Sequence, residues 1–414
     1  MAKELQNLGA HIIAIKDMAG LLKPQAAYRL ISELKASIDV PIHLHTHDTS
    51  GNGIITYSAA TKAGVDIVDV AMSAVSGATS QPSMSSLYYA LVNGERCPEI
   101  NVDNIQQLNH YWEDVRMYYH PFENGLNAPQ TEVYKHEMPG GQYSNLQQQA
   151  KAVGLGEKWD EIKEVYHEVN MMFGDIVKVT PSSKVVGDMA LFMVQNGLSE
   201  QDIYDKGETL SFPESVVTFF QGELGQPVGG FPKELQRIIL KGRPAFTERP
   251  GAFAEPVDFE KVKAELAEKI GYQPKTEEVL SYLMYPQVFL DYRKAYEQFA
   301  DVKVLDTPTF FNGMRLGETI NVELEKGKIL IIRLDEIGEP DIEGNRTLFF
   351  NLNGQRREIL VKDHSIISSV QTKNAKLSQQ NKRNKIGATM SGSVLQVLVK
   401  KRGSGSERTN RSSN

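Results

Sequence analysis

The segment Val40-Pro-Ile-His-Leu-His45 is a short, largely apolar run of the kind that is buried in a parallel sheet. Two other segments share this character, His11-Ile-Ile-Ala-Ile15 before it and Val65-Asp-Ile-Val-Asp-Val70 after it. After each of these strands, apolar residues recur with helical spacing, at 20–34, 53–64 and 84–92. Strands that alternate with helices predict an α/β fold with a parallel sheet, either a (β/α)8 barrel or a doubly wound sheet. A complete barrel needs about 250 residues, so a barrel here would be roughly half of one.

The remainder of the chain changes period twice. Helical spacing and polar turns after residue 99 predict helices at 102–119, 143–153, 159–173, 184–196 and 259–270, with a bend or loop at 222–232. From about residue 303 the apolar residues alternate with polar ones, which predicts strands at 320–324, 328–334, 346–352 and 355–361. Asn353-Gly354 lies between the last two strands and is typical of a type I′ hairpin turn.

Composition and charge exclude several classes of protein. The 414 residues include 41% hydrophobic and 23% charged residues, which excludes a mostly disordered chain, a collagen-like repeat and a coiled coil. A net charge of −7 gives no electrostatic reason to expect binding to nucleic acid or to an anionic membrane. The single cysteine, Cys97, cannot form an intrachain disulfide, and the sequence lacks both a secretory signal and a membrane span. We therefore expect a cytoplasmic protein.

Candidate metal ligands gather where the first two predicted strands end. His45 and His47 form a His-x-His pair, and residues two apart in a strand point to the same face, so both imidazoles can meet one metal ion. Lys16 ends the preceding strand on the same rim. Hydrogen-bonded rim histidines explain the pair equally well, and we interpret His43 as structural or as a support for a ligand. Three carboxylates could also lie on the rim without being fixed as ligands: Asp17, Asp48 and Asp69.

A second polar group, Thr180-Pro-Ser-Ser-Lys184, precedes a predicted helix. Local rules favour helix N-capping as the role of its hydroxyl groups. For His136-Glu137, which comes just before a Gly-containing turn, we expect a packed structural pair.

Four segments together resemble the carboxyltransferase domain of pyruvate carboxylase. They are Lys16-Asp-Met-Ala-Gly-Leu-Leu22, His43-Leu-His-Thr-His-Asp-Thr-Ser-Gly51, His136-Glu-Met-Pro-Gly-Gly-Gln-Tyr143 and Val179-Thr-Pro-Ser-Ser-Lys-Val-Val-Gly187. The order of the later segments agrees with that family, namely Gly225-Gln-Pro-Val-Gly-Gly-Phe-Pro232, Thr307-Pro-Thr-Phe-Phe-Asn-Gly313 and Gly387-Ala-Thr-Met390, which resembles the opening of a biotin carrier domain. The resemblance extends from residue 1 to about residue 401.

This resemblance implies roles for individual residues. Lys16 corresponds to a lysine that is carboxylated to serve as an anionic metal ligand, and His45 and His47 correspond to the two histidine ligands of a divalent metal, Mn or Zn. Thr180 corresponds to the threonine that shuttles a proton while CO2 passes from carboxybiotin to pyruvate, which yields oxaloacetate. By the same resemblance, Ser183 and Lys184 line the biotin pocket.

The resemblance also implies the domain organisation and the assembly. We expect a homotetramer without nucleic-acid or membrane partners, and the fold class of the second half of a (β/α)8 TIM barrel with a helical extension, a β-rich region and a biotinyl-type stub. The predicted segments are 1–98 (half-barrel), 99–300 (helical extension), 301–365 (β-rich tetramerisation or allosteric region), 366–385 (linker), 386–401 (truncated biotin carrier stub) and 402–414 (disordered tail).

Several departures from the family pattern lead us to expect a fragment that is inactive alone. The ATP-grasp domain and its ATP site are absent, the family's aspartate ligand and its substrate-binding arginine and glutamine would precede Met1, and the biotinyl lysine would follow the point where the resemblance ends. Ser391 stands where the family has proline. Two alternatives stay open: a subunit of the oxaloacetate decarboxylase or transcarboxylase type, and a catalytically dead fragment that supports assembly.

Overall fold

A three-stranded parallel sheet forms near the start of the chain. In the computed structural model, which describes residues 1–123 and 126–365, the strand order is β1 (Ile13–Asp17), β2 (Ile42–Thr46) and β3 (Ile67–Val68). The register of β1 and β2 places Lys16 opposite His45. Since the strands are parallel, residues paired in this way point to the same face of the sheet.

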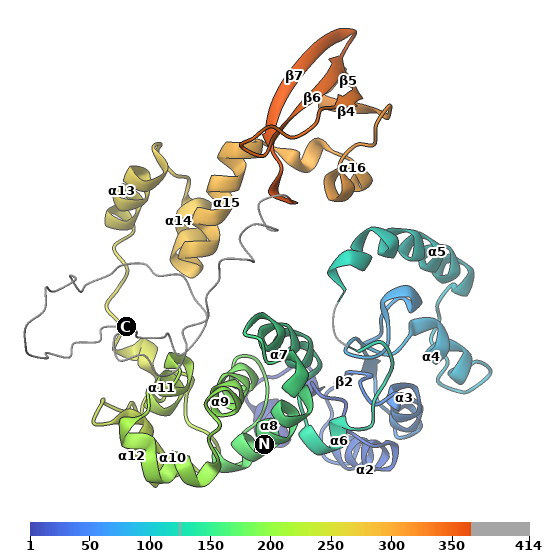
Figure 1. The fold of residues 1–414 in the computed structure, drawn as a ribbon. Coiled ribbons are helices and arrows are strands. Elements are labelled where there is room, and N and C mark those ends of the chain that lie inside the picture. Colours follow the sequence, from blue (N-terminus) through green and yellow to red (C-terminus); the bar gives the residue numbers. More distant parts are fainter. Residues whose placement is uncertain (124–125, 366–414) are drawn as a thin grey trace, which may run out of the picture. The chain divides into compact units, whose positions relative to one another are not determined.

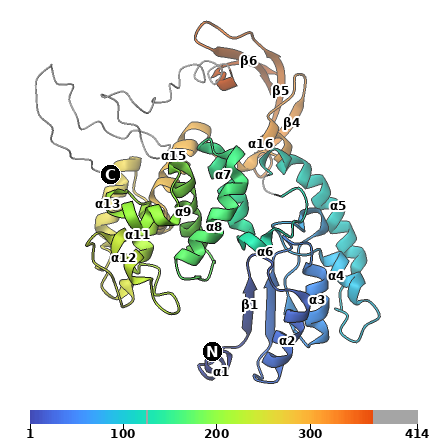
Figure 2. The same cartoon turned by 60° about the horizontal axis from the view of Figure 1, so that its bottom comes forward.

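The two faces of this sheet differ in polarity. Ile42 and Leu44 of β2 are fully buried and belong to an apolar core that includes Ile31 and Tyr57 from the following helices. His43 and His45, which alternate with them, are only half-buried. Figure 2 shows the helices α2 and α3 together on one side of the strands. The apolar positions therefore face helices, and the histidines occupy the opposite face. The helices of this part are α1 (Ala2–Asn7), α2 (Pro24–Lys35), α3 (Gly53–Lys62), α4 (Met84–Leu91) and α5 (Val102–Tyr119).

A helical region with a core of its own follows. Its helices are α6 (Val133–His136), α7 (Gly140–Ala152), α8 (Trp159–Met172), α9 (Ser182–Asn196), α10 (Glu200–Lys206), α11 (Glu214–Gln221) and α12 (Lys233–Leu240). The helices α8 and α9 pack side by side, as Figure 1 shows in green. Fully buried side chains such as Tyr166, Phe173, Met189 and Phe220 fill this core. The predicted helices in this region are confirmed within a few residues, whereas α10, α11 and α12 were not predicted.

The next helices form smaller contacts. They are α13 (Phe259–Ile270), α14 (Thr276–Met284), α15 (Pro286–Phe299) and α16 (Thr307–Asn312), of which only α13 was predicted. Leu266, Val279 and Phe289 make a compact core between the first three. The ring of Phe311 lies 4.9 Å from that of Tyr119, measured between centroids, so α16 packs against the end of α5.

The four strands predicted after residue 303 are present, and they form one antiparallel sheet in sequence order. They are β4 (Thr319–Glu325), β5 (Lys328–Ile337), β6 (Asn345–Leu352) and β7 (Gln355–Lys362). Asn353 and Gly354 have φ values of 49° and 84°, and positive φ at both central residues is what a type I′ turn requires. The predicted hairpin is therefore confirmed.

Contacts along the chain divide it into two units, 1–339 with 347–361 and 340–346 with 362–414. Within the described part of the second unit, Arg346 Nε lies 2.7 Å from an Asp363 carboxylate oxygen. The predicted linker, biotin carrier stub and tail lie outside the described residues.

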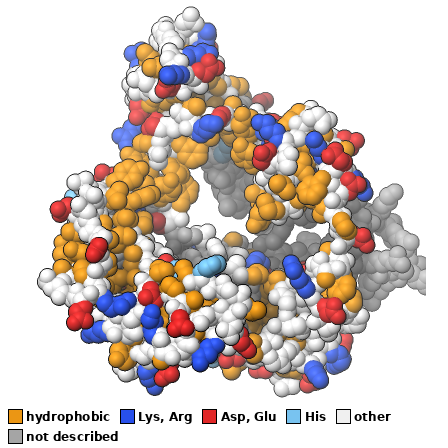
Figure 3. Space-filling view, turned by 180° about the vertical axis from the view of Figure 1, so that it is seen from behind, with side chains coloured by type: hydrophobic (Ala, Val, Ile, Leu, Met, Phe, Trp, Pro, Cys, Tyr) orange, Lys and Arg blue, Asp and Glu red, His pale blue; other side chains and the backbone are white. Residues whose placement is uncertain are grey.

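The surface of the described residues carries many apolar side chains. Figure 3 shows them gathered over several parts of one face. Phe122 and Phe299, for example, are each 62% exposed. None of the helices in the described residues is both long enough and apolar enough to cross a bilayer.

Candidate metal centre

Lys16, His45 and His47 come together at the carboxyl end of the parallel sheet, as the sequence predicts. Lys16 and His45 are register partners, and the rings of His45 and His47 lie 5.2 Å apart between centroids. The backbone N–H of His47 donates to the carbonyl oxygen of Asp17, 3.2 Å away, and so continues the pairing past the end of β2. The Lys16 amine forms no hydrogen bond or ion pair with the residues that the structure describes and is exposed to solvent.

His45 is held through one ring nitrogen. Its Nδ1 lies 2.7 Å from Oδ2 of Asp69, and Nε2 of His43 lies 2.8 Å from Oδ1 of the same carboxylate. An ionised carboxylate only accepts hydrogen bonds, so Nδ1 of His45 carries the proton. Nε2 of His45 then has a lone pair, and within the described part of the chain it has no hydrogen-bond partner.

His47 is held in the same manner by a backbone group. Its Nδ1 donates to the carbonyl oxygen of Thr79 over 2.6 Å, which again leaves the lone pair on Nε2. The side-chain nitrogen of Gln81 lies 3.4 Å from that Nε2. Burial lowers the pKa of His47, which favours the neutral form that a metal requires.

The donor set fits a divalent cation. Nε2 of His45 and Nε2 of His47, the latter in contact with the Gln81 amide, lie on the same rim as Lys16, whose amine can bind a cation once carboxylation has made it an anion. In residues 1–123 and 126–365 there is no group of three or more His, Cys, Asp or Glu side chains placed to hold a metal. Lys16, the third ligand predicted from the sequence, is not one of these residue types and ends the neighbouring strand as the register partner of His45.

The rim carboxylates separate into different roles. Asp17 accepts hydrogen bonds from the backbone N–H groups of Leu21 and Leu22, each 2.9 Å long, and from the Thr46 hydroxyl. Asp48 accepts a 2.8 Å hydrogen bond from the N–H of Gly53. These two carboxylates hold loops, whereas Asp69 holds the histidines.

The Thr180 segment differs from its local prediction. Pro181 occupies the N-cap position of α9, and no side chain there caps the helix. The Ser182 hydroxyl instead accepts from the backbone N–H of Val179, 3.1 Å away, so the prediction of side-chain N-capping is wrong. Proline at the cap has no side-chain oxygen to offer, which is the physical reason.

The proposed pocket residues on this segment have unequal surroundings. Thr180 is exposed and Ser183 is buried, 3% exposed. The amine of Lys184 forms an ion pair with Asp188 one helical turn later. No described contact joins these side chains to His45 or His47.

A cavity of about 290 Å³ lies between the end of β1 and the segment that precedes Thr180. Lys16 and Met18 line it from one side, and Ile176 and Lys178, just before Thr180, line it from the other. Glu137 also lines it and forms a 2.9 Å ion pair with Lys178. This pair was not predicted, because its members are 41 residues apart in the sequence.

His136 and Glu137 are packed, as predicted, but not against each other. His136 is 4% exposed, and its Nδ1 accepts a 3.0 Å hydrogen bond from the N–H of Met138. Burial is the main cause that lowers the pKa of His136, to about 4.

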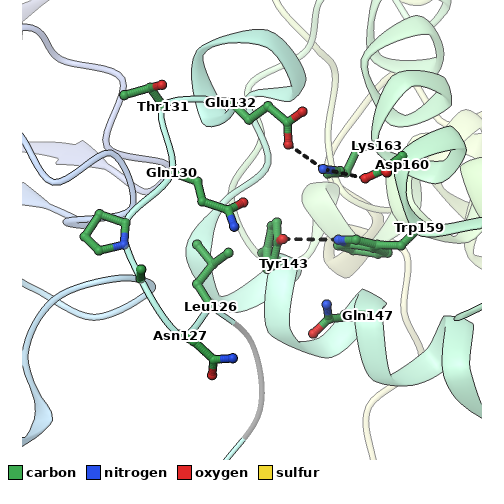
Figure 4. Close-up of a pocket in the computed structure, with 12 residues that line it drawn as sticks. Leu126, Asn127, Gln130, Thr131, Glu132, Tyr143, Gln147, Trp159, Asp160 and Lys163 are labelled. Atoms are coloured by element: carbon green, nitrogen blue, oxygen red, sulfur yellow. Dashed lines mark hydrogen bonds and ion pairs between the residues drawn. The ribbon is translucent and has the colours of Figure 1, made fainter. Parts of the chain in front are cut away.

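Figure 4 shows a separate cavity of about 780 Å³ between the 126–132 segment and the helices α7 and α8. Lys163 forms ion pairs there with Glu132 and Asp160, and the Trp159 N–H donates to the Tyr143 hydroxyl over 3.1 Å. Its prominent polar groups are paired with one another, so we assign this cavity no ligand.

Comparison with known proteins shows which family the chain resembles. The model of the HMGL-like family matches residues 1–111, and the model described as a conserved carboxylase domain matches residues 133–333. Pyruvate carboxylase of Bacillus subtilis is 59% identical over 399 residues, which are 96% of this chain and 35% of that protein. The chain belongs to the pyruvate carboxylase family. Mitochondrial pyruvate carboxylase of Homo sapiens is 43% identical over 96% of the chain.

Solved structures agree with this assignment and extend it to the fold. The carboxyl transferase domain of Rhizobium etli pyruvate carboxylase matches with a TM-score of 0.82 and 48% identity, over 87% of this chain and 61% of that one. The same domain has been solved with pyruvate and biocytin. The predicted TIM-barrel type of carboxyltransferase fold is therefore confirmed. The chain spans about a third of the length of the curated pyruvate carboxylases that it matches.

Proposed function

We propose that this chain supplies part of the carboxyltransferase site of pyruvate carboxylase, in which CO2 passes from carboxybiotin to pyruvate and oxaloacetate is formed, and that the chain alone does not carboxylate pyruvate. The observation that supports this most directly is the rim of the parallel sheet, where His45 and His47 each present Nε2 beside Lys16. The Rhizobium etli carboxyl transferase domain, which was solved with pyruvate and biocytin, supports the choice of substrates.

In this proposal, carboxylated Lys16, His45 and His47 hold Mn or Zn. A divalent cation at that point supplies Lewis acidity for the negative charge that develops on pyruvate. The two histidines are already oriented by Asp69 and by the Thr79 carbonyl, so little side-chain freedom is lost when a metal binds.

Thr180 is the proposed proton shuttle. An alcohol both donates and accepts hydrogen bonds, so the same oxygen can take a proton from the methyl group of pyruvate and give a proton elsewhere. Its exposure leaves the hydroxyl accessible to a substrate. Ser183 and Lys184 are the proposed contacts for biotin, and a bound biotin would compete with Asp188 for the Lys184 amine.

The test combines metal analysis with an activity assay. We expect the purified chain to bind one equivalent of Mn or Zn, and an assay of oxaloacetate decarboxylation with free biotin and oxamate tests the chain for residual turnover. Thr180→Ala should abolish this turnover while metal content is retained, and Thr180→Ser, which keeps the hydroxyl, should restore part of it. Turnover that is unchanged in Thr180→Ala would exclude the proton shuttle, and a chain without stoichiometric metal would exclude the metal site.

For assembly and location we propose a homotetramer in the cytoplasm, as the family resemblance implies. The β-rich segment at 320–361 supports pyruvate carboxylase over a decarboxylase subunit, because it matches the region to which the family's tetramerisation is ascribed. Sedimentation equilibrium measures the oligomeric state of the chain directly. A monomer at all accessible concentrations would contradict the tetramer.

A further inference from the structure

Asp69 occupies a tightly defined place at the end of β3. Its backbone N–H donates to the carbonyl oxygen of Leu44 over 3.3 Å. Its own carbonyl oxygen accepts a 2.8 Å hydrogen bond from the hydroxyl of Tyr57, a fully buried side chain that also accepts from the N–H of Thr46. The backbone of Asp69 is thus hydrogen-bonded to β2 directly and also through Tyr57. These bonds fix the position from which the Asp69 side chain extends.

The carboxylate itself is shared by two imidazoles from β2. Oδ1 meets Nε2 of His43 at 2.8 Å, and Oδ2 meets Nδ1 of His45 at 2.7 Å. Each carboxylate oxygen thus accepts a hydrogen bond from the imidazole nitrogen that faces it.

We propose that Asp69 is a positioning residue that selects the tautomer of His45 and so directs Nε2 of His45 toward the metal. This inference rests on the proposed metal site. A neutral imidazole carries one proton, and the hydrogen bond made by one nitrogen determines which nitrogen is free to bind a cation. The hydrogen bond from His43 to Oδ1 restricts rotation of the carboxylate, so that Oδ2 stays directed at His45.

If Asp69 served only the stability of the fold, its removal would destabilise the chain without changing the tautomer of His45. The side chains of His43, His45 and Asp69 are 28%, 22% and 38% exposed, and polar contacts with this much access to water contribute little to folding stability. Removal of the carboxylate should therefore change the tautomer of His45 far more than it changes the stability of the chain.

The first test measures the tautomer in the metal-free chain. Long-range 1H–15N NMR of chain labelled at histidine, at a pH where the imidazoles are neutral, should show Nδ1–H for His45. In Asp69→Ala the signal should move toward the Nε2–H form, and Asp69→Asn, whose amide oxygen still accepts, should keep most of the Nδ1–H form. Asp66→Asn is the matched control, because Asp66 binds the N–H of Ile42 and Lys35 but no histidine, and it should leave the His45 signal unchanged.

The second test measures affinity for Zn²⁺ alone, by competition with a chromophoric chelator. Asp69→Ala should lower the affinity by about 10- to 100-fold, the range seen when such supporting groups are removed, and Asp69→Asn should restore most of it. Two results would overturn the role of Asp69. One is a wild-type chain in which His45 carries its proton on Nε2, and the other is an Asp69→Ala chain whose His45 tautomer and Zn²⁺ affinity are both unchanged. A wild-type chain with Nδ1–H His45 that binds no Zn²⁺ would instead overturn the proposed metal site, and with it the metal-directing part of the inference.

Discussion

Gly140 approaches His47 so closely that a Cβ atom at residue 140 would stand 2.7 Å from Nδ1 of His47 and 2.8 Å from the Thr79 carbonyl oxygen. These two atoms are the partners of the hydrogen bond that orients His47. The backbone N–H of Gly140 also donates to the carbonyl oxygen of Met18 over 2.9 Å, which holds the start of α7 against the loop after β1. The candidate metal centre therefore depends on the absence of a side chain at residue 140.

Gly140→Ala should disturb the metal centre before it disturbs the rest of the fold. The methyl group must displace either the His47 ring or the Thr79 backbone, and forced contacts of this kind cost about 1–3 kcal/mol. We expect weaker Zn²⁺ binding in equilibrium titrations. Gly141→Ala is the control, because a Cβ there meets nothing within 4 Å, and equal affinity in both variants would contradict the prediction.

Gly20 has a comparable role on the other side of His47. It has a φ of +74°, and a Cβ would collide with the carbonyl oxygen of His47, a backbone atom that cannot rotate away. Gly154 has nearly the same φ, +78°, with nothing within 4 Å of its Cβ position. Gly154→Ala should cost about 1–2 kcal/mol in urea unfolding, from backbone strain alone. Gly20→Ala should cost at least about 1 kcal/mol more, because the collision adds to the strain.

The comparison of these two variants includes a result that would contradict the proposed collision at residue 20. Equal losses of stability in Gly20→Ala and Gly154→Ala would show that the backbone conformation alone matters at residue 20. A Gly20→Ala chain that does not fold would agree with the larger penalty, provided that Gly154→Ala folds normally.

His136 should make folding stability depend on pH. Burial, followed by the nearby positive charge of Lys163, lowers the pKa of His136 from 6.5 to about 4 in the folded chain. Between these values the unfolded chain binds a proton that the folded chain does not, so this group lowers stability as the pH falls from about 6.5 to about 4. The free energy of unfolding should fall by about 1 kcal/mol between pH 7.5 and 5.5, and by roughly 3 kcal/mol in total once the pH is below about 4.

The contribution of His136 can be isolated by substitution. Urea unfolding of the wild-type chain and of His136→Gln, each at several pH values, gives two stability profiles. The profile of His136→Gln should be flatter across this interval by the amounts given above, whatever its absolute stability. Parallel profiles would contradict the assignment.

Lys163 should be worth more to stability than an ordinary surface lysine. It is 7% exposed and pairs with Glu132, on the segment before α6, and with Asp160 in its own helix, so it connects two elements. Lys163→Met should cost about 1–3 kcal/mol in urea unfolding, because Glu132 loses its charged partner. Lys158→Met removes an exposed pair with Glu161 and should change stability by less than about 1 kcal/mol. A difference too small to measure would mean that Glu132 is fully solvated without Lys163.

Local pattern was enough to predict the framework. Short, largely apolar runs such as Val40–His45 and the helical spacing after them predicted the parallel sheet and its helices, because buried parallel strands and amphipathic helices pack together in this way. The alternation of side chains along a strand placed His45 and His47 on one side, and Asn353-Gly354 predicted a turn that needs two positive φ angles. The short helices α10, α11 and α12 escaped prediction, because tertiary packing more than local preference stabilises helices of that length.

Tertiary structure alone settled how the site is held together. The proton on His45 is positioned by Asp69, 24 residues away, and the proton on His47 by the Thr79 carbonyl, a backbone group that every residue type possesses. Thr180 looked like a capping residue until Pro181 was seen to occupy the N-cap position. Residue types and spacing report what a short segment prefers, whereas these contacts join distant segments and exist only once the strand register and the crossovers bring them together.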